Sequence, residues 1–173
     1  RGLTHLSITD ENLFGAVEFT RLCREHGINP IIGCDFKITS PLPDGTVQEG
    51  VRLLLIAENN QGYGNLLKLS SHYFLDQEQP ALTEALLKEY HGGLIAITGG
   101  MIGEERLQDF EEIFGKRNLF IEIQAPEGEE ARENTSLLRS LSQRSGIQLI
   151  ATIPVHYLHK EEASSYLTLR KIG

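Results

Sequence analysis

The stretch ITDENLFGAVEF, from Ile8 to Phe19, joins the end of an apolar run to the start of a helical pattern with almost no turn between them. Asp10 lies at that junction. From Leu13 onward, apolar residues recur three or four positions apart, which predicts an amphipathic helix. A carboxylate at the C-terminal end of a strand is where α/β folds place their chemistry. The stretch therefore predicts a strand–helix unit and makes Asp10 the first candidate site residue.

The same alternation of strand and helix patterns continues along the rest of the chain. We expect strands at 5–9, 30–38, 51–57, 93–98, 119–123 and 147–152, and helices at 13–27, 66–74, 82–90, 104–114, 129–144 and 160–171. The segment 40–50 contains proline, Asp-Gly and glycine, which predicts a turn between two strands. This order favours the α/β class, with a mainly parallel sheet or a barrel covered by helices.

Length, hydrophobicity and net charge argue against a membrane protein and against a nucleic-acid-binding protein. The 173 residues have the length of one ordinary domain, with 40% hydrophobic and 23% charged residues. No apolar run approaches the roughly 18 residues of a membrane span, so we expect no membrane contact and a cytoplasmic location. The net charge of −8 repels phosphate, and Lys and Arg are scattered, so direct nucleic-acid binding is not expected. Cys23 and Cys34 lack metal-type spacing and are expected to be reduced thiols.

Five motifs occur in a recognisable order. They are TDENLFGAVEF (9–19), GINPIIGCDF (27–36), LLLIAENNQGYGNLLKLSS (53–71), GLIAITGG (93–100) and ATIPVHYL (151–158). The series resembles the PHP (polymerase and histidinol phosphatase) domain at the N-terminus of bacterial DNA polymerase III alpha subunits. The resemblance covers essentially all of 1–173 as one domain. It implies a fragment of a distorted β/α barrel that lacks its first strand and belongs to the N-terminal part of a longer polymerase chain.

The resemblance allows two functional states. Some PHP domains hold a cluster of metal ions at the C-terminal ends of the strands, and free-standing relatives use that cluster to hydrolyse phosphate esters. In some polymerases the cluster is associated with a metal-dependent 3′–5′ exonuclease. In others the site has decayed, and the domain serves as a scaffold and docking surface for a separate proofreading exonuclease. The ligand positions must therefore decide between these states.

Three ligand positions keep a side chain that could coordinate metal. Asp10 survives from a motif that normally reads Thr-Asp-His-Gly, although Asp10 and Asn12 would serve equally well to cap the following helix. Asp35 stands where the family usually has glutamate, and its shorter side chain retracts the carboxylate by more than about 1 Å, against a tolerance of about 0.2 Å for coordination distances. His156 is retained in the last motif. These three are the expected remnant of a metal site.

Four other ligand positions are expected to be lost. Glu11 occupies the place of the histidine in the first motif, and the segment is one residue shorter, so a rescue by its carboxylate is not expected. Arg52 replaces a histidine, has no lone pair for a metal, and could instead form an ion pair with Asp10, Glu11 or Asp35. Gly100 offers no side chain, and Pro154 replaces an aspartate.

Two functional hypotheses follow. In the first, this is a non-catalytic PHP domain without a cofactor of its own, in a replicative DNA polymerase whose Mg²⁺-dependent nucleotidyl transfer takes place downstream. Its partners would be the rest of the polymerase chain and a proofreading exonuclease subunit. In the second, Asp10, Asp35 and His156 join an upstream His-x-His pair in an active phosphoesterase or 3′–5′ exonuclease that uses Mn²⁺ or Zn²⁺.

Overall fold

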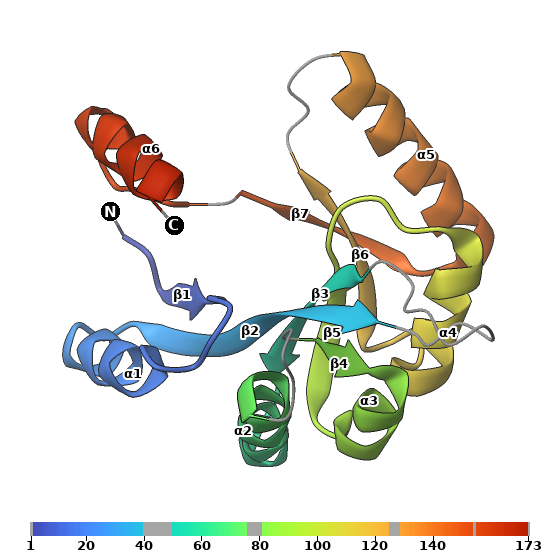
Figure 1. Ribbon diagram of the computed structural model, residues 1–173, viewed down its shortest axis with the longest axis horizontal. Coiled ribbons are helices and arrows are strands. Elements are labelled where there is room, and N and C mark those ends of the chain that lie inside the picture. The colour runs from blue at the N-terminus through green and yellow to red at the C-terminus, as the bar shows by residue number, and fades with distance from the viewer. Residues whose placement is uncertain (1, 40–49, 76–80, 125–128, 154, 173) are drawn as a thin grey trace.

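The computed structural model describes residues 2–39, 50–75, 81–124, 129–153 and 155–172. A curled mixed sheet forms the centre of the fold, with helices packed against its convex side (Figure 1). The strand order is β1-β2-β3-β5-β6-β7, and β4 pairs with the end of β2. The strands are β1 (His5–Ile8), β2 (Asn29–Thr39), β3 (Val51–Ala57), β4 (Leu82–Thr83), β5 (Leu94–Thr98), β6 (Leu119–Gln124) and β7 (Gln148–Thr152).

Most of the strand pairs are parallel, as the alternating pattern predicts. The exception is β3, which runs antiparallel to both of its neighbours, β2 and β5. The residues at the start of β3 therefore lie at the same edge of the sheet as the C-terminal ends of β2 and β5. The half-barrel curl of the sheet agrees with a distorted barrel fragment, which is the fold class expected from the sequence.

Alternation along the strands separates the two faces of the sheet. Residues such as Cys34, Phe36, Leu53 and Leu55 point to the convex face and are buried in one apolar cluster. Four helices complete that cluster with buried leucines and phenylalanines: α2 (Asn60–Leu75), α3 (Glu84–Tyr90), α4 (Glu104–Phe114) and α5 (Glu129–Ser145). α1 (Ala16–Glu25) buries Ala16 and Cys23, which do not belong to this cluster. The core therefore lies between the sheet and these helices, and the concave face is left for other side chains.

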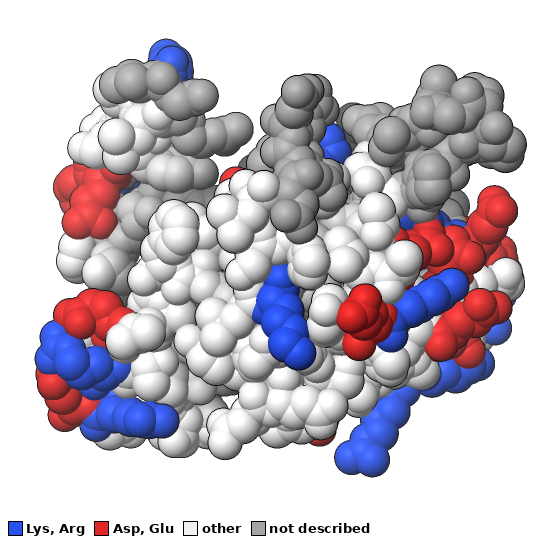
Figure 2. Space-filling view, turned by 60° about the horizontal axis from the view of Figure 1, so that its bottom comes forward, with Lys and Arg blue, Asp and Glu red and all other residues white. Residues whose placement is uncertain are grey.

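The last element, α6 (Ala163–Ile172), lies apart from the other helices (Figure 1). It follows a short 3₁₀ helix, η1 (Lys160–Glu162), with which it forms its main contacts. On the side of the molecule that includes α2 and α3, many charged side chains lie toward the margins, and the largely uncharged middle of this face also carries basic and acidic side chains (Figure 2). No helix in the described parts of the chain is long and apolar enough to cross a membrane.

The structure corrects three helix boundaries. α1 begins at Ala16 rather than residue 13, because Asn12 Oδ1 accepts a hydrogen bond from the backbone N–H of Phe14 (3.0 Å) and forms a turn first. The segment expected to be helical from residue 82 begins with the short strand β4, and α3 follows with the Thr83 side chain as its N-cap. The turn expected at 40–50 lies almost entirely outside the described residues.

The third correction concerns α2, which begins at Asn60 and not near residue 66. Two glycines in this stretch argue against a helix from the sequence, but Gly62 is required by packing. A Cβ built on Gly62 would overlap the backbone carbonyl of Gly93, with the carbonyl carbon only 2.6 Å away. Asn59 Oδ1 accepts a hydrogen bond from the Gly62 N–H (3.0 Å), and Asn65 Nδ2 donates one to the Gly92 carbonyl (2.8 Å). The first turn of α2 is therefore fastened to the turn before β5.

Candidate site on the concave face of the sheet

Charged side chains from three strands meet on the concave face. Asp35 of β2 lies opposite Leu54 of β3 in the antiparallel register, so Arg52 is its diagonal neighbour on the same face. A long arginine side chain can span such a diagonal. The Arg52 Nε donates to Asp35 Oδ2, and Arg52 Nη1 lies 3.7 Å from Glu122 Oε2 of β6. We call Asp35, Arg52, Glu122 and Thr152 the Arg52 cluster.

Glu122 and Thr152 are the two members of the cluster that were not expected from the sequence. Glu122 is only 5% exposed, and its Oε1 accepts a hydrogen bond from the Thr152 hydroxyl of β7 at 2.6 Å. The available signal was a lone carboxylate within the apolar strand LFIEI. A buried carboxylate needs a compensating charge or hydrogen bonds, so such a residue points to a partner on a neighbouring strand.

Gly99 provides the space over which the Arg52 side chain passes. Leu53 pairs with Thr98, so Gly99 comes next to Arg52 in the register, and its N–H donates to the Arg52 carbonyl (2.9 Å). A Cβ at Gly99 would lie 2.8 to 3.0 Å from the Arg52 Cβ, Cγ and Cδ. Any larger residue here would force the arginine to move.

Burial and charge compete within the cluster. Burial raises the pKa of Asp35, and the Arg52 guanidinium opposes that rise. Burial works against the charge of Arg52, but Asp35 and Glu122 outweigh it and raise the arginine pKa. Asp35 Oδ1 and Glu122 Oε2 are buried and have no hydrogen-bond donor among the described residues. One guanidinium thus serves two carboxylates and satisfies neither of them fully.

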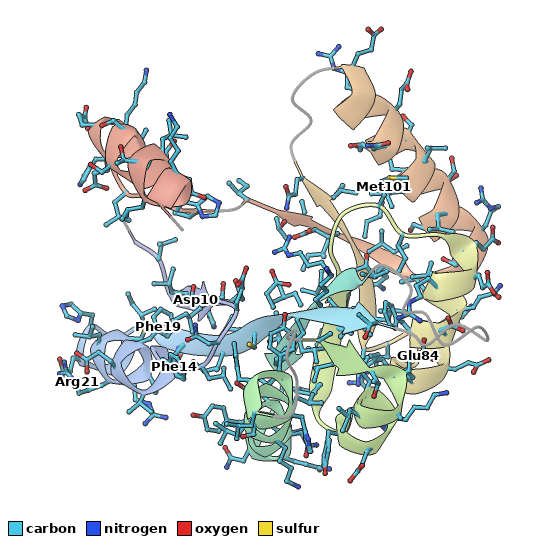
Figure 3. The ribbon with its side chains drawn as sticks, in the orientation of Figure 1. Asp10, Phe14, Phe19, Arg21, Glu84 and Met101 are labelled. Carbon is cyan, nitrogen blue, oxygen red and sulfur yellow. The ribbon has the colours of Figure 1, made fainter. Side chains whose placement is uncertain are left out.

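Asp10 approaches the cluster through its backbone and not through its side chain. The Asp10 carbonyl accepts a hydrogen bond from the Asp35 N–H (3.0 Å), while the side chains of Asp10 and Glu11 are exposed. Asp10 lies on the β1 side of the curled sheet, and Met101, which follows Gly100, lies across the molecule toward β6 (Figure 3). Neither Asp10 nor Asn12 caps the next helix as expected, because the N-cap residue of α1 is Gly15, without a side-chain cap, and Asn12 accepts its hydrogen bond from Phe14 in the preceding turn.

The remaining expected ligand positions lie elsewhere. His156 is exposed and stacks on Tyr166, with ring centroids 4.6 Å apart and 9° between the ring planes. Gly100 is exposed, with φ +67° and no atom within 4 Å of an added Cβ. Pro154 lies outside the described residues. Within the described ranges, no three His, Cys, Asp or Glu side chains are grouped so that they could hold a metal ion.

The sequence profile described as "PHP domain" matches residues 1–107, which is more than half of the chain. The chain belongs to the PHP family. The family that the motifs suggested is thereby confirmed.

This PHP chain is also similar to named polymerase subunits. It is 34% identical over 186 residues to the DNA polymerase III subunit alpha of Bacillus subtilis, covering 99% of this chain and 16% of that protein. The corresponding protein of Treponema pallidum is 30% identical over 194 residues (99% and 17%), and that of Thermus aquaticus 32% over 190 residues (96% and 16%). The chain thus spans about a sixth of the length of these curated relatives.

The side chains of the Arg52 cluster determine what the concave face of this PHP domain can bind. Arg52 can donate hydrogen bonds and hold a positive charge, but it has no lone pair for a metal. The half-buried carboxylate of Asp35 and the buried carboxylate of Glu122 already share that charge. The cluster can therefore join strands electrostatically across the sheet.

Proposed function

We propose that this chain is part of the N-terminal PHP domain of a bacterial replicative DNA polymerase III alpha subunit, and that its metal site has degenerated. The domain would act in the cytoplasm as a structural and docking element and would catalyse no reaction of its own. The polymerase itself would perform DNA-directed nucleotidyl transfer with Mg²⁺ in a downstream domain. The observation that carries the proposal is the Arg52 guanidinium placed between Asp35 and Glu122.

The donor set does not fit a multinuclear metal centre. Such a centre needs neutral imidazole and carboxylate ligands that converge from several strand ends. Here Asp35 is paired with a fixed positive charge, and that charge would repel a divalent cation. His156 stacks on Tyr166, and the Asp10 side chain faces solvent. These features support the assignment of Asp10, Asp35 and His156 as a remnant and of Arg52 as a lost ligand position. The assignment of Glu11, Gly100 and Pro154 as lost positions rests on the sequence.

The proposed partners are the rest of the polymerase chain and a proofreading exonuclease subunit. The first is supported by relatives that carry about five-sixths of their length outside the matching region. The second rests on the resemblance to PHP domains that have a decayed site. In the full natural chain, we expect a purified proofreading exonuclease from the same organism to co-elute with the wild-type polymerase on gel filtration.

Metal titration tests the degenerate site. The full natural chain carrying this sequence would be stripped with EDTA and titrated with Mn²⁺ or Zn²⁺ by calorimetry, as wild type and as His156→Ala. His26→Ala is the matched control, because His26 is an exposed histidine at the end of α1, away from the cluster. We expect the same metal stoichiometry in all three proteins. Several tight ions that disappear only in His156→Ala would overturn the proposal.

Activity provides an independent readout. With added Mn²⁺, the wild-type chain and its Asp35→Ala variant should hydrolyse p-nitrophenyl phosphate and single-stranded DNA at the same background rate. If the wild type instead shows Mn²⁺-dependent hydrolysis that Asp35→Ala abolishes, the domain is an active phosphoesterase or exonuclease.

A further inference from the structure

Arg52, Gly99 and Glu122 are neighbours on the concave face. Thr98 pairs with Ile121 in the parallel β5–β6 register, so Gly99 and Glu122 come next to each other one step further along. Arg52, Gly99 and Glu122 therefore form a row across β3, β5 and β6, with the glycine in the middle. The arginine side chain must cross the middle strand to reach the carboxylate, and the glycine leaves the space for it.

We propose that Arg52 is a structural cation that connects β3 to β2 and β6, with Gly99 as its required neighbour and Glu122 as its required counter-charge. This inference deepens the proposed function and rests on it in one respect, namely that no metal ion fills this place. Thr152 extends the connection to β7, because its hydroxyl donates to the same carboxylate. Together these contacts connect β2, β3, β6 and β7.

The burial of Glu122 is the first support. A carboxylate that is 5% exposed within an apolar strand is strongly unfavourable unless a charge or hydrogen bonds compensate it. The Thr152 hydroxyl satisfies one oxygen, and the Arg52 guanidinium provides the positive charge near the other. If Arg52 were removed, Asp35 and Glu122 would lose their shared positive charge, and Glu122 would keep only the hydrogen bond from Thr152.

The shape of the guanidinium is the second support. Arg52 uses Nε toward Asp35 and Nη1 toward Glu122, so two different nitrogens of one planar group serve two strands. A lysine has a single nitrogen and cannot present such a fork. Arg52→Lys should therefore keep the charge but lose part of the connection between β2 and β6.

A double-mutant cycle tests the proposal in the full natural chain with EDTA present. The variants are Arg52→Met, Glu122→Gln and both together, and the readout is hydrogen–deuterium exchange of peptides that cover β3 and β6. In the wild-type background, Glu122→Gln should speed exchange about tenfold, because it removes the charge that pairs with Arg52. In the Arg52→Met background the same change should slow exchange, because it removes an uncompensated buried charge. The sign of the effect should reverse.

Gly99→Ala provides the steric arm of the test. It should speed exchange of β3 and β5 peptides several-fold in the wild type and have a much smaller effect in Arg52→Ala, which lacks the Cγ and Cδ atoms that would collide. Arg52→Lys retains the charge and should fall between wild type and Arg52→Met, so the proposal stays testable even if Arg52→Met does not fold.

Additive effects in the Glu122 cycle, or equal effects of Gly99→Ala in both backgrounds, would overturn the inference. Its failure can be told apart from failure of the proposed function. If the effect of Glu122→Gln on exchange reverses between the two backgrounds and metal binding depends on His156, the structural role of Arg52 is supported and the degenerate metal site is refuted. If the effects of Arg52→Met and Glu122→Gln on exchange are additive and no His156-dependent metal binding is found, only the structural role of Arg52 is refuted.

Discussion

The close contact between Gly62 of α2 and Gly93 before β5 makes a sharp prediction for Gly62→Ala. The added methyl group would overlap a backbone carbonyl, and a backbone atom cannot rotate away as a flexible side chain can. α2 would have to move away from the turn. That movement would weaken two hydrogen bonds, one from the Glu58 N–H to the Gly93 carbonyl (2.9 Å) and one from Asn65 Nδ2 to the Gly92 carbonyl (2.8 Å).

The magnitude follows from three contributions to the free energy of unfolding. Overpacking costs about 1–3 kcal/mol, and the two hydrogen bonds contribute about 0.5–1.5 kcal/mol each. Alanine is favoured over glycine within a helix by about 1 kcal/mol, which offsets part of the loss. The net expectation is that Gly62→Ala lowers the free energy of unfolding by about 3 kcal/mol.

Gly64→Ala is the matched control in the same helix. A Cβ on Gly64 meets no atom within 4 Å, so only the helix preference applies and the variant should be stabilised by up to about 1 kcal/mol. Urea unfolding of the full natural chain, followed by hydrogen exchange of peptides from α2 and β5, would measure both changes. If the two variants shift stability in the same direction, the reasoning about the Gly62–Gly93 contact is wrong.

Three further predictions concern single side chains. Thr83→Ala should lower the free energy of unfolding by about 1 kcal/mol in urea titrations, because Thr83 Oγ1 accepts the Leu86 N–H at the start of α3 (3.4 Å). Burial raises the pKa of Cys34 to about 12, so at pH 8 its alkylation by iodoacetamide should be about a thousandfold slower than in the urea-unfolded chain, and mass spectrometry showing equal rates would contradict this. Thr152→Val should cost about 1.5–3 kcal/mol through the lost bond to Glu122, whereas Thr152→Ser should retain most of the stability in the same urea assay.

Much of the fold could be predicted because hydrophobic periodicity reflects local geometry. The six main strands lie within a residue or two of their expected ranges, and α4 (Glu104–Phe114) matches its expected range. The start of α2 could not be predicted from local preference, because Gly62 is determined by a contact with a turn 31 residues away. The antiparallel pairing of β2 with β3 agrees with the turn expected between them, but the pairing of β3 with β5 depends on which strands become neighbours, and the periodicity of a single strand does not encode its neighbours.

The candidate site was predictable only in part. The ion pair between Arg52 and Asp35 was among the pairings that the sequence suggested, and the structure confirms it. Glu122 was missed, because it belongs to no expected ligand position and its role depends on the register of β5 with β6. The degenerate state of the metal site stays a prediction, which the titration with His156→Ala would test.

The succession of β2 and β3 along the chain has an evolutionary consequence. Asp35 and Arg52 lie on these two consecutive strands, within the stretch from Asn29 to Ala57. Recombination of that stretch alone would transfer the carboxylate and the guanidinium together. Glu122 is encoded about 70 codons after Arg52, outside that stretch, so such an exchange would leave it behind. Lineages that exchange the stretch without Glu122 would reveal the order in which this network was assembled.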